Sequence, residues 1–98
     1  MEIEKKKDGT KLEVRLSGRL DTLTSKDLEA SLKEEIPAVK EMTVDLKKVD
    51  YISSAGLRLF LTYSKALGGK EHVVIRNANS VIKEIFAATA FSNFVTIA

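Results

Sequence analysis

Two adjacent serines, Ser53 and Ser54, stand where an expected strand is followed by an expected helix. A helix N-terminus presents unpaired backbone N–H groups and about half a positive charge, so it favours an anion. A phosphate on either hydroxyl would lie in that field and accept those hydrogen bonds. The small residues Ala55 and Gly56 come next, and we expect them to keep the first turn open to a modifying enzyme. The serine pair is therefore a candidate phosphorylation site.

The same pair also has a purely structural explanation. Serine is among the residues most favoured as a helix N-cap, so spacing alone favours a cap over a modification site. Gly56 weakens this simpler explanation, because glycine inside a helix costs up to about 1 kcal/mol relative to alanine. Something other than helix propensity is expected to account for that glycine.

The helix expected over residues 54–67 is more apolar than one sheet face requires. Packing on a sheet needs an apolar stripe little more than about 100° wide. Here the apolar residues cover more than half of the helix: Leu57, Leu59, Phe60, Leu61, Tyr63, Ala66 and Leu67. We expect Leu57 and Leu61, at one margin, to remain partly exposed beside the serines, where they would suit a protein interface. The alternative is a helix that is more deeply buried than its neighbours.

Other residues offer little catalytic or metal-binding chemistry. His72 is the single histidine and has no second ligand nearby, whereas zinc sites use three or four ligands. Asp45 is expected on the polar face of its strand, and Asp50 in a loop or cap. Nucleophilic catalysis by Ser54 would need an oriented base, which the sequence does not offer. We therefore expect no enzyme activity, no cofactor and no metal site; a small hydrolase using Ser54 is the weakest rival hypothesis.

Hydrophobic periodicity predicts the elements that position these residues. Alternation predicts strands over 11–17 and 42–47, and an unbroken β-branched run predicts one over 72–76. A turn at Asp8-Gly9 makes 2–6 a strand that pairs with 11–17, and a terminal strand is expected over 94–97. Apolar residues at helical spacing predict helices over 24–36, 54–67 and 80–90. Their expected ends are an N-cap at Thr24, a stop at Pro37, closure at Gly68-Gly69, and a cap at Asn79 or Ser80.

The predicted order β-β-α-β-α-β-α-β defines an α/β fold. Each β-α-β unit requires parallel pairing, whereas the opening hairpin adds an antiparallel pair. We expect a mixed β-sheet with its helices packed over it, in a single domain covering residues 1–98. The charged first strand, with Lys5 to Lys7, is expected at a solvated edge.

Composition excludes several classes of function. The 98 residues include no cysteine, which fits a reducing cytosol and a cytoplasmic protein. No apolar run follows the basic N-terminal cluster, and none reaches the roughly 18–20 residues of a membrane span, so we expect neither a signal peptide nor direct membrane insertion. The net charge of +2 comes from interleaved acids and bases rather than from a basic stripe, so nucleic-acid binding is not expected.

Three stretches together resemble one bacterial family. YISSAGL, at 51–57, resembles the phosphorylation motif of anti-sigma factor antagonists, which are proteins of the STAS domain class. LSGRLDT, at 16–22, resembles the Gly-x-Leu-Asp turn of that family. VIKEIF, at 81–86, followed by Ala90-Phe91, resembles its last helix. The resemblance covers essentially the whole chain and implies a STAS-like fold.

The resemblance also implies a function. The unphosphorylated form would bind an anti-sigma factor that is also a serine kinase and so release a sigma factor. Phosphorylation of Ser54, the serine two residues before the motif glycine, would switch binding off, and a serine phosphatase would restore it. The implied partner-binding residues are Asp21, Thr22, Ser53, Ser54, Ala55, Gly56, Leu57, Arg58 and Leu61. A dianion at Ser54 would have to be desolvated within an apolar interface, which is unfavourable without a basic partner.

Two departures from the family pattern matter. Many members have aspartate immediately before the phosphoserine, whereas this chain has Ser53, which becomes a second candidate acceptor. The glycine common in the last helix is Ala90 here, which we expect to affect packing only. An alternative function is that of a STAS adaptor subunit in a transport or signalling complex, without phosphoregulation.

Overall fold

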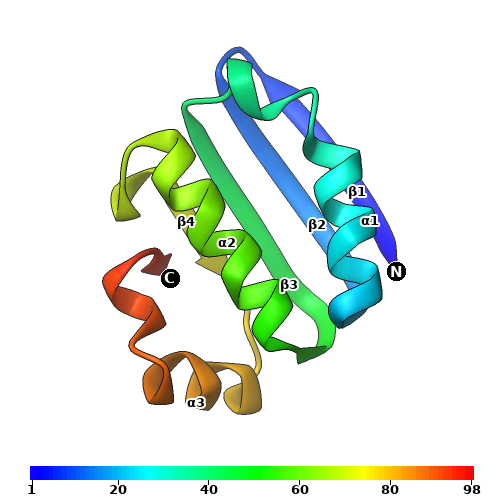
Figure 1. The fold of residues 1–98 in the computed structure, drawn as a ribbon, viewed down its shortest axis with the longest axis vertical. Coiled ribbons are helices and arrows are strands. Elements are labelled where there is room, and N and C mark those ends of the chain that lie inside the picture. The colour runs from blue at the N-terminus through cyan, green and yellow to red at the C-terminus, as the bar shows by residue number, and fades with distance from the viewer.

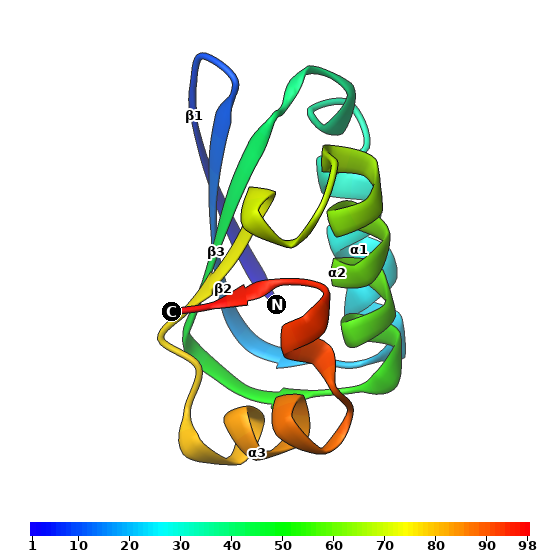
Figure 2. The ribbon, with the colours of Figure 1, turned by 90° about the vertical axis from the view of Figure 1, so that its left-hand side faces the viewer.

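The computed structural model describes residues 1–98, which form a mixed five-stranded sheet with its helices on one face and at one end (Figures 1 and 2). The strands are β1 (Glu2–Asp8), β2 (Lys11–Leu20), β3 (Glu41–Ile52), β4 (Val73–Arg76) and β5 (Thr96–Ile97). The helices are α1 (Thr22–Leu32), α2 (Ser54–Leu67) and α3 (Ser80–Ala88), with 3₁₀ turns at Ile36–Ala38, Lys70–His72 and Phe91–Asn93. The predicted α/β fold and element order are confirmed.

The sheet order is β1-β2-β3-β4-β5. β1 pairs with β2 antiparallel, and the three following pairs are parallel, as the predicted hairpin and β-α-β units require. Helices α1 and α2 lie side by side over one face of the sheet, and α3 lies beyond one end (Figures 1 and 2). None of the helices has the length and apolar character needed to cross a membrane.

The hydrophobic core lies between the sheet and the helices. Alternate residues of β2, β3 and β4 point inward, and the apolar faces of the helices cover them. Fully buried members include Val14, Val44, Ile75, Leu28 and Phe60. At the C-terminal end, the rings of Phe86 and Phe91 stack with their centroids 4.6 Å apart. This one continuous core fixes the position of α2, and with it the position of the serine pair.

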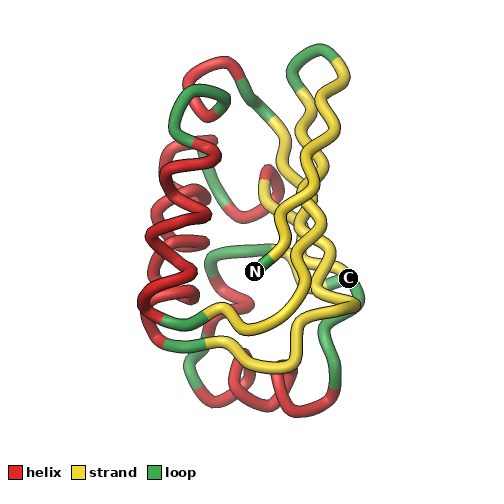
Figure 3. The backbone as a smooth tube through the Cα atoms, turned by 90° about the vertical axis from the view of Figure 1, so that its right-hand side faces the viewer, coloured by secondary structure: helices red, strands yellow, loops and turns green.

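The other face of the sheet carries alternating charges, and helices α1 and α2 lie on the opposite side of the strands (Figure 3). The strand registers place Glu4 beside Arg15, Arg15 beside Asp45, and Asp45 beside Arg76. Opposite charges on neighbouring strands stabilise a sheet. The pKa of Asp45 is lowered despite its desolvation, because the Lys47 backbone N–H, Asn77 and the two flanking arginines favour the carboxylate. This face is therefore a structural, solvated surface.

The first helix has different ends from those predicted. Asp21, not Thr24, is its N-cap, and Thr24 is the third helical residue. The helix stops at Leu32, before the predicted stop at Pro37, which lies in a 3₁₀ turn. Lys5 Nζ donates to the carbonyl of Ser31 at 2.8 Å and pairs with Glu35 at 3.1 Å, so β1 holds this end of the helix. Lys5 is thus a contact residue rather than part of a purely solvated edge.

The predicted ends of β3, β4, β5 and α3 were also wrong. β3 continues to Ile52, so Asp50 lies in a strand rather than in a loop or cap. His72 precedes β4 in a 3₁₀ turn, and β5 has only two residues. Helix α3, capped by Asn79, ends at Ala88, and Ala90 adopts a left-handed conformation with φ of 55° that cannot continue a helix.

Candidate functional site

The structure gives the two serines different roles. Ser53 is the N-cap of α2, and its Oγ accepts a hydrogen bond from the Gly56 backbone N–H at 3.3 Å. Its own backbone N–H donates to the Leu20 carbonyl at 2.8 Å. Ser54 is the first helical residue; it is exposed, and its hydroxyl forms no hydrogen bond. The cap and the free hydroxyl are therefore separate residues, which spacing alone did not distinguish.

Gly56 is explained by close packing. It is buried where the first turn of α2 meets the ends of β2 and β3. A Cβ atom there would lie 2.9 Å from two side-chain carbons of Leu20, closer than real Cβ contacts, and 3.0 Å from Ile52 Cγ1, which is also tight. The expectation that Gly56 keeps the turn open to another protein was therefore wrong. The absence of a side chain at Gly56 lets the side chains of Leu20 and Ile52 pack against the helix. Ala55, by contrast, is half-buried at the surface.

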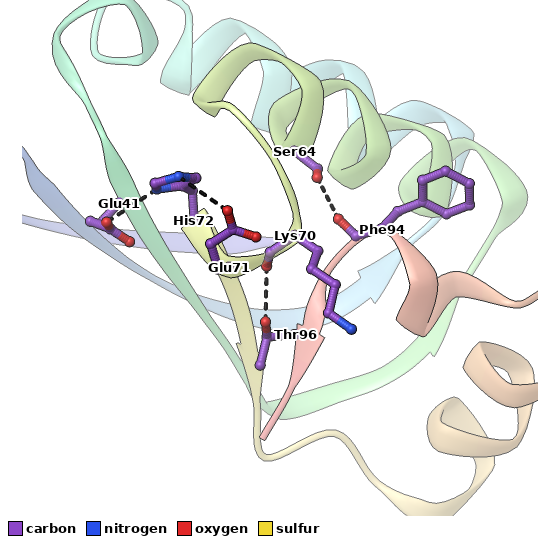
Figure 4. A network of polar contacts seen from close by, with 7 residues as sticks. All are labelled: Glu41, Ser64, Lys70, Glu71, His72, Phe94 and Thr96. Carbon is purple, nitrogen blue, oxygen red and sulfur yellow. Dashed lines mark hydrogen bonds and ion pairs between the residues drawn. The ribbon is translucent and has the colours of Figure 1, made fainter.

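The exposed apolar margin of α2 was predicted correctly at one residue and wrongly at the other. Leu61 is half-buried, whereas Leu57 is only 9% exposed and belongs to the core. Helix α2 has neighbours on both sides. Helix α1 flanks one side, and on the other the Ser64 hydroxyl donates to the Phe94 carbonyl of the C-terminal segment (Figure 4). At Leu57, the helix is therefore buried more deeply than expected, as the alternative stated.

Asp21 positions the start of α1. Its Oδ1 accepts from the Thr24 backbone N–H at 2.9 Å, and Thr24 Oγ1 accepts from the Asp21 backbone N–H at 2.8 Å. This reciprocal capping box satisfies two otherwise unpaired donors. The hydrogen bonds from Thr24 lower the pKa of Asp21. The Asp21 carboxylate is thus used for capping, and the next residue, Thr22, is exposed.

A groove of about 240 Å³ lies between α1 and α2. Its lining residues are Thr22, Ser25, Lys26 and Glu29 of α1 with Ala55, Arg58, Leu59 and Thr62 of α2. The structure therefore brings together three of the predicted site residues, Thr22, Ala55 and Arg58. Leu61 and Ser54 do not line this groove, although Ser54 directly precedes the lining residue Ala55 in the sequence.

On the α1 side of this surface, sequence reasoning identified Thr22 but missed the residues that follow it. Lys26 and Glu29 follow Thr22 at helical spacing, which could have indicated that they share its face. Leu23, 71% exposed, is the most exposed large apolar residue of the chain and lies in the first turn of α1. An exposed leucine beside polar residues would suit a protein contact.

His72 has carboxylate neighbours that the sequence did not predict (Figure 4). Its Nδ1 lies 3.1 Å from Glu41 Oε1, and its Nε2 lies 3.7 Å from Glu71 Oε1. Nearby, the Thr96 hydroxyl donates to the Lys70 carbonyl at 2.9 Å. No group of three or more histidine and acidic side chains is arranged to hold a metal ion. The contacts tie the turn before β4 to β3 and β5.

Comparison with known proteins identifies the family. The family model described as "Mlab, STAS domain" matches residues 3–96. A relative from Bordetella bronchiseptica, named "Putative anti-sigma factor antagonist BtrV", is 29% identical over 85 residues, covering 85% of this chain and 73% of the relative.

Solved structures show the same fold. The anti-sigma factor antagonist SpoIIAA in its unphosphorylated form has a TM-score of 0.72 at 18% identity, covering 88% of this chain and 82% of that one. The phosphorylated form, described as a Bacillus cell fate determinant, has a TM-score of 0.74 at 17% identity, covering 99% and 91%. The NMR structure of the protein TM1081 has a TM-score of 0.78 at 15% identity, covering 96% and 78%. Because the family model matches nearly the whole chain, this protein belongs to the STAS domain family.

Proposed function

We propose that this protein is a cytoplasmic anti-sigma factor antagonist that is regulated by phosphorylation of Ser54. The unphosphorylated form binds an anti-sigma factor with serine kinase activity and thereby releases a sigma factor for transcription. Phosphorylation ends this binding, and a serine phosphatase restores it. The name of the Bordetella relative and the likeness to SpoIIAA support the role in binding an anti-sigma factor.

The observation that carries the phosphorylation step is the division of roles between the two serines. Ser53 has its Oγ engaged as the cap of α2, whereas the Ser54 hydroxyl is exposed and unbonded at the first helical position. A kinase can therefore reach Ser54 without breaking the cap. Ser53 remains the secondary candidate, because modifying it would sacrifice its hydrogen bond to Gly56.

The chemistry requires nothing from this chain beyond a reachable hydroxyl. The Ser54 Oγ–P bond forms as the bond between the γ-phosphorus of ATP and its bridging oxygen breaks. The hydroxyl proton is released and ADP leaves. Because the kinase binds the ATP, the antagonist needs no cofactor of its own. The resulting dianion would lie at the N-terminus of α2, where the helix dipole stabilises it.

A phosphate at Ser54 would oppose docking through desolvation. The proposed contact surface joins Leu23 and Leu61 to the groove residues Thr22, Ala55 and Arg58. Burying a dianion on such a partly apolar surface is unfavourable unless the partner supplies cations. The phosphate that the helix terminus stabilises in the free protein would therefore make the phosphorylated form a poor partner.

Phosphosite mapping tests the proposal. The protein is isolated from its own cells during growth and stress and analysed by intact and peptide-level mass spectrometry. We expect phosphate on Ser54 that changes with condition, and its loss in Ser54→Ala but not in Ser53→Ala. Absence of phosphate under every condition would contradict the proposal.

A second candidate is an adaptor subunit of a transport or signalling complex without phosphoregulation. The observation that favours it is the description of the matching family model, which names Mlab rather than an anti-sigma factor antagonist. Stable co-purification with membrane transporter subunits, together with unmodified Ser54, would support this function.

A further inference from the structure

We propose that Arg58 is the residue through which phosphorylation alters the partner surface: it pairs with a phosphate on Ser54, whereas without phosphate it binds an acidic side chain of the partner in the α1–α2 groove. This inference rests on the proposed function and assigns the switch to one guanidinium group.

The positions of Ser54 and Arg58 allow the pairing. They lie four residues apart in α2, and both are exposed. Residues at this spacing are neighbours on the same face of a helix. Arginine and phosphate match in geometry, since the planar guanidinium donates two parallel hydrogen bonds to two phosphate oxygens. A phosphate on Ser54 would therefore find a cation of its own chain one helical turn away.

Arg58 is free to change partners. Its guanidinium forms no ion pair or side-chain hydrogen bond in the structure. Arg15, by contrast, pairs with Glu13 at 3.0 Å, and Arg19 lies over the ring of Tyr51 at 4.4 Å. A cation in the N-terminal half of a helix gains nothing from the helix dipole. The helix dipole therefore does not account for Arg58, and its unpaired guanidinium is available to a ligand.

Arg58 also lines the groove, unlike Ser54. The charged groups facing it from α1 are Lys26 and Glu29, while Thr22 and Ser25 are neutral. The groove therefore has two cations and one carboxylate, and the N-terminal turn of α2 adds partial positive charge. A carboxylate from an acidic segment of the partner is the complementary group, because Arg58 can hold it with two hydrogen bonds.

A phosphate on Ser54 would compete for that contact in two ways. It would occupy the guanidinium that the partner carboxylate needs, and its two negative charges would repel the carboxylate. Phosphorylation would therefore remove a specific attractive contact, that between Arg58 and the partner carboxylate. This loss adds to the unfavourable desolvation of the phosphate.

The pairing is tested by phosphorus NMR on the full chain carrying genetically encoded phosphoserine at position 54. The second pKa of the phosphate is compared between the wild type, Arg58→Gln and the control Lys65→Gln, an exposed cation in the last turn of α2. We expect Arg58→Gln to raise this pKa by about half a unit, because a neighbouring cation favours the dianion. Lys65→Gln should leave it unchanged. Equal values in the wild type and Arg58→Gln would overturn the pairing.

The groove contact is tested by titrating unphosphorylated protein with the serine-kinase anti-sigma factor of the same genome. We expect Arg58→Gln to weaken binding about tenfold, as loss of a charged hydrogen-bonded pair does, and Lys65→Gln to have no effect. Phosphoserine at position 54 should then weaken binding less in Arg58→Gln than in the wild type. Wild-type affinity in Arg58→Gln would overturn the groove contact. If the wild type itself does not bind, the proposed function and the groove contact both fail, whereas the NMR result still decides the pairing.

Discussion

Ser53 and Ser54 have the same side chain but different surroundings. The hydroxyl of Ser53 is a hydrogen-bond acceptor for the backbone of α2, and that of Ser54 has no partner. A modification site needs an accessible group whose loss leaves the fold intact. At the scale of single residues, Ser54 meets both requirements, whereas Ser53 is half-buried and its hydroxyl is engaged in the cap. Substitution of Ser53 should therefore affect mainly stability, and substitution of Ser54 mainly regulation.

Removing the two hydroxyls should have unequal effects on stability. Ser53→Ala is expected to lower the free energy of unfolding by about 1 kcal/mol, since it leaves the Gly56 N–H unpaired. Ser54→Ala should change it by less than about 0.5 kcal/mol, because it loses no contact. Urea unfolding measures both. A larger loss for Ser54→Ala would mean that the cap has been assigned to the wrong serine.

Ala90 has a backbone conformation that should affect the stability of the protein. Its φ of 55° lies in the left-handed region, which disfavours residues with a Cβ by roughly 1–2 kcal/mol. Ala90→Gly is therefore expected to stabilise the protein by about 0.5–1 kcal/mol, after the greater flexibility of glycine in the unfolded chain is included. Thermal unfolding tests this, with Ala87→Gly, inside α3, as a control that should be destabilising. A destabilising Ala90→Gly would contradict the assigned backbone conformation. The expectation that this position affects packing only was wrong.

At the scale of elements, the two helix starts form one surface. Asp21 caps α1 and Ser53 caps α2, and the first turns of both helices line the same groove. The position of α2 depends on Gly56, which lets its first turn approach Leu20 of β2 and Ile52 of β3. The serine pair is thus held by packing beneath it as well as by the cap.

Gly56→Ala tests this packing directly. In an exposed helix the substitution would stabilise by up to about 1 kcal/mol. Here we expect destabilisation of about 1–3 kcal/mol, because the new Cβ overlaps Leu20 and Ile52. Chemical denaturation gives the sign. A stabilised variant would show that the helix does not approach the sheet so closely.

Asp21 should make the first helix start sensitive to acid. Its pKa is lowered in the folded protein by the hydrogen bonds from Thr24. The carboxylate therefore contributes stability above its ordinary pKa, and this contribution is lost as the pH falls through the lower, folded value. Asp21→Asn keeps a capping oxygen but does not titrate. Between about pH 5 and pH 2, urea unfolding should show the wild type losing stability relative to Asp21→Asn. A constant difference across this range would contradict the account.

At the scale of the whole molecule, periodicity was sufficient to predict the mixed sheet and the order of the elements. Strands of period two and helices of period 3.6 alternate along the chain, and the βαβ rule then gives the parallel pairs. The ends of α1 and α3 were not predictable in this way. They depend on a cap at Asp21, a contact from Lys5, and the left-handed Ala90, which involve backbone conformation or residues distant in sequence.

The candidate site was also only partly predictable from the sequence. The motif placed the serines at a helix start, but it could not show which hydroxyl the cap consumes. The burial of Leu57 was missed because the pattern of one helix does not show what packs beside it, and α2 has α1 on one side and the C-terminal segment on the other. The groove was missed because it requires the relative placement of α1 and α2.

The measurement that tests the central claim most directly is a titration of the proposed partner, a serine-kinase anti-sigma factor, with four proteins: wild type, Ser54→Ala, Ser54→Asp and Ser80→Asp. Ser80 is a matched control, since it is the exposed first residue of α3 and follows the cap residue Asn79. We predict that Ser54→Asp binds at least about tenfold more weakly than the wild type, a difference of about 1.4 kcal/mol. Ser54→Ala and Ser80→Asp should bind as the wild type does. Equal affinity of Ser54→Asp and Ser54→Ala would contradict a switch at Ser54.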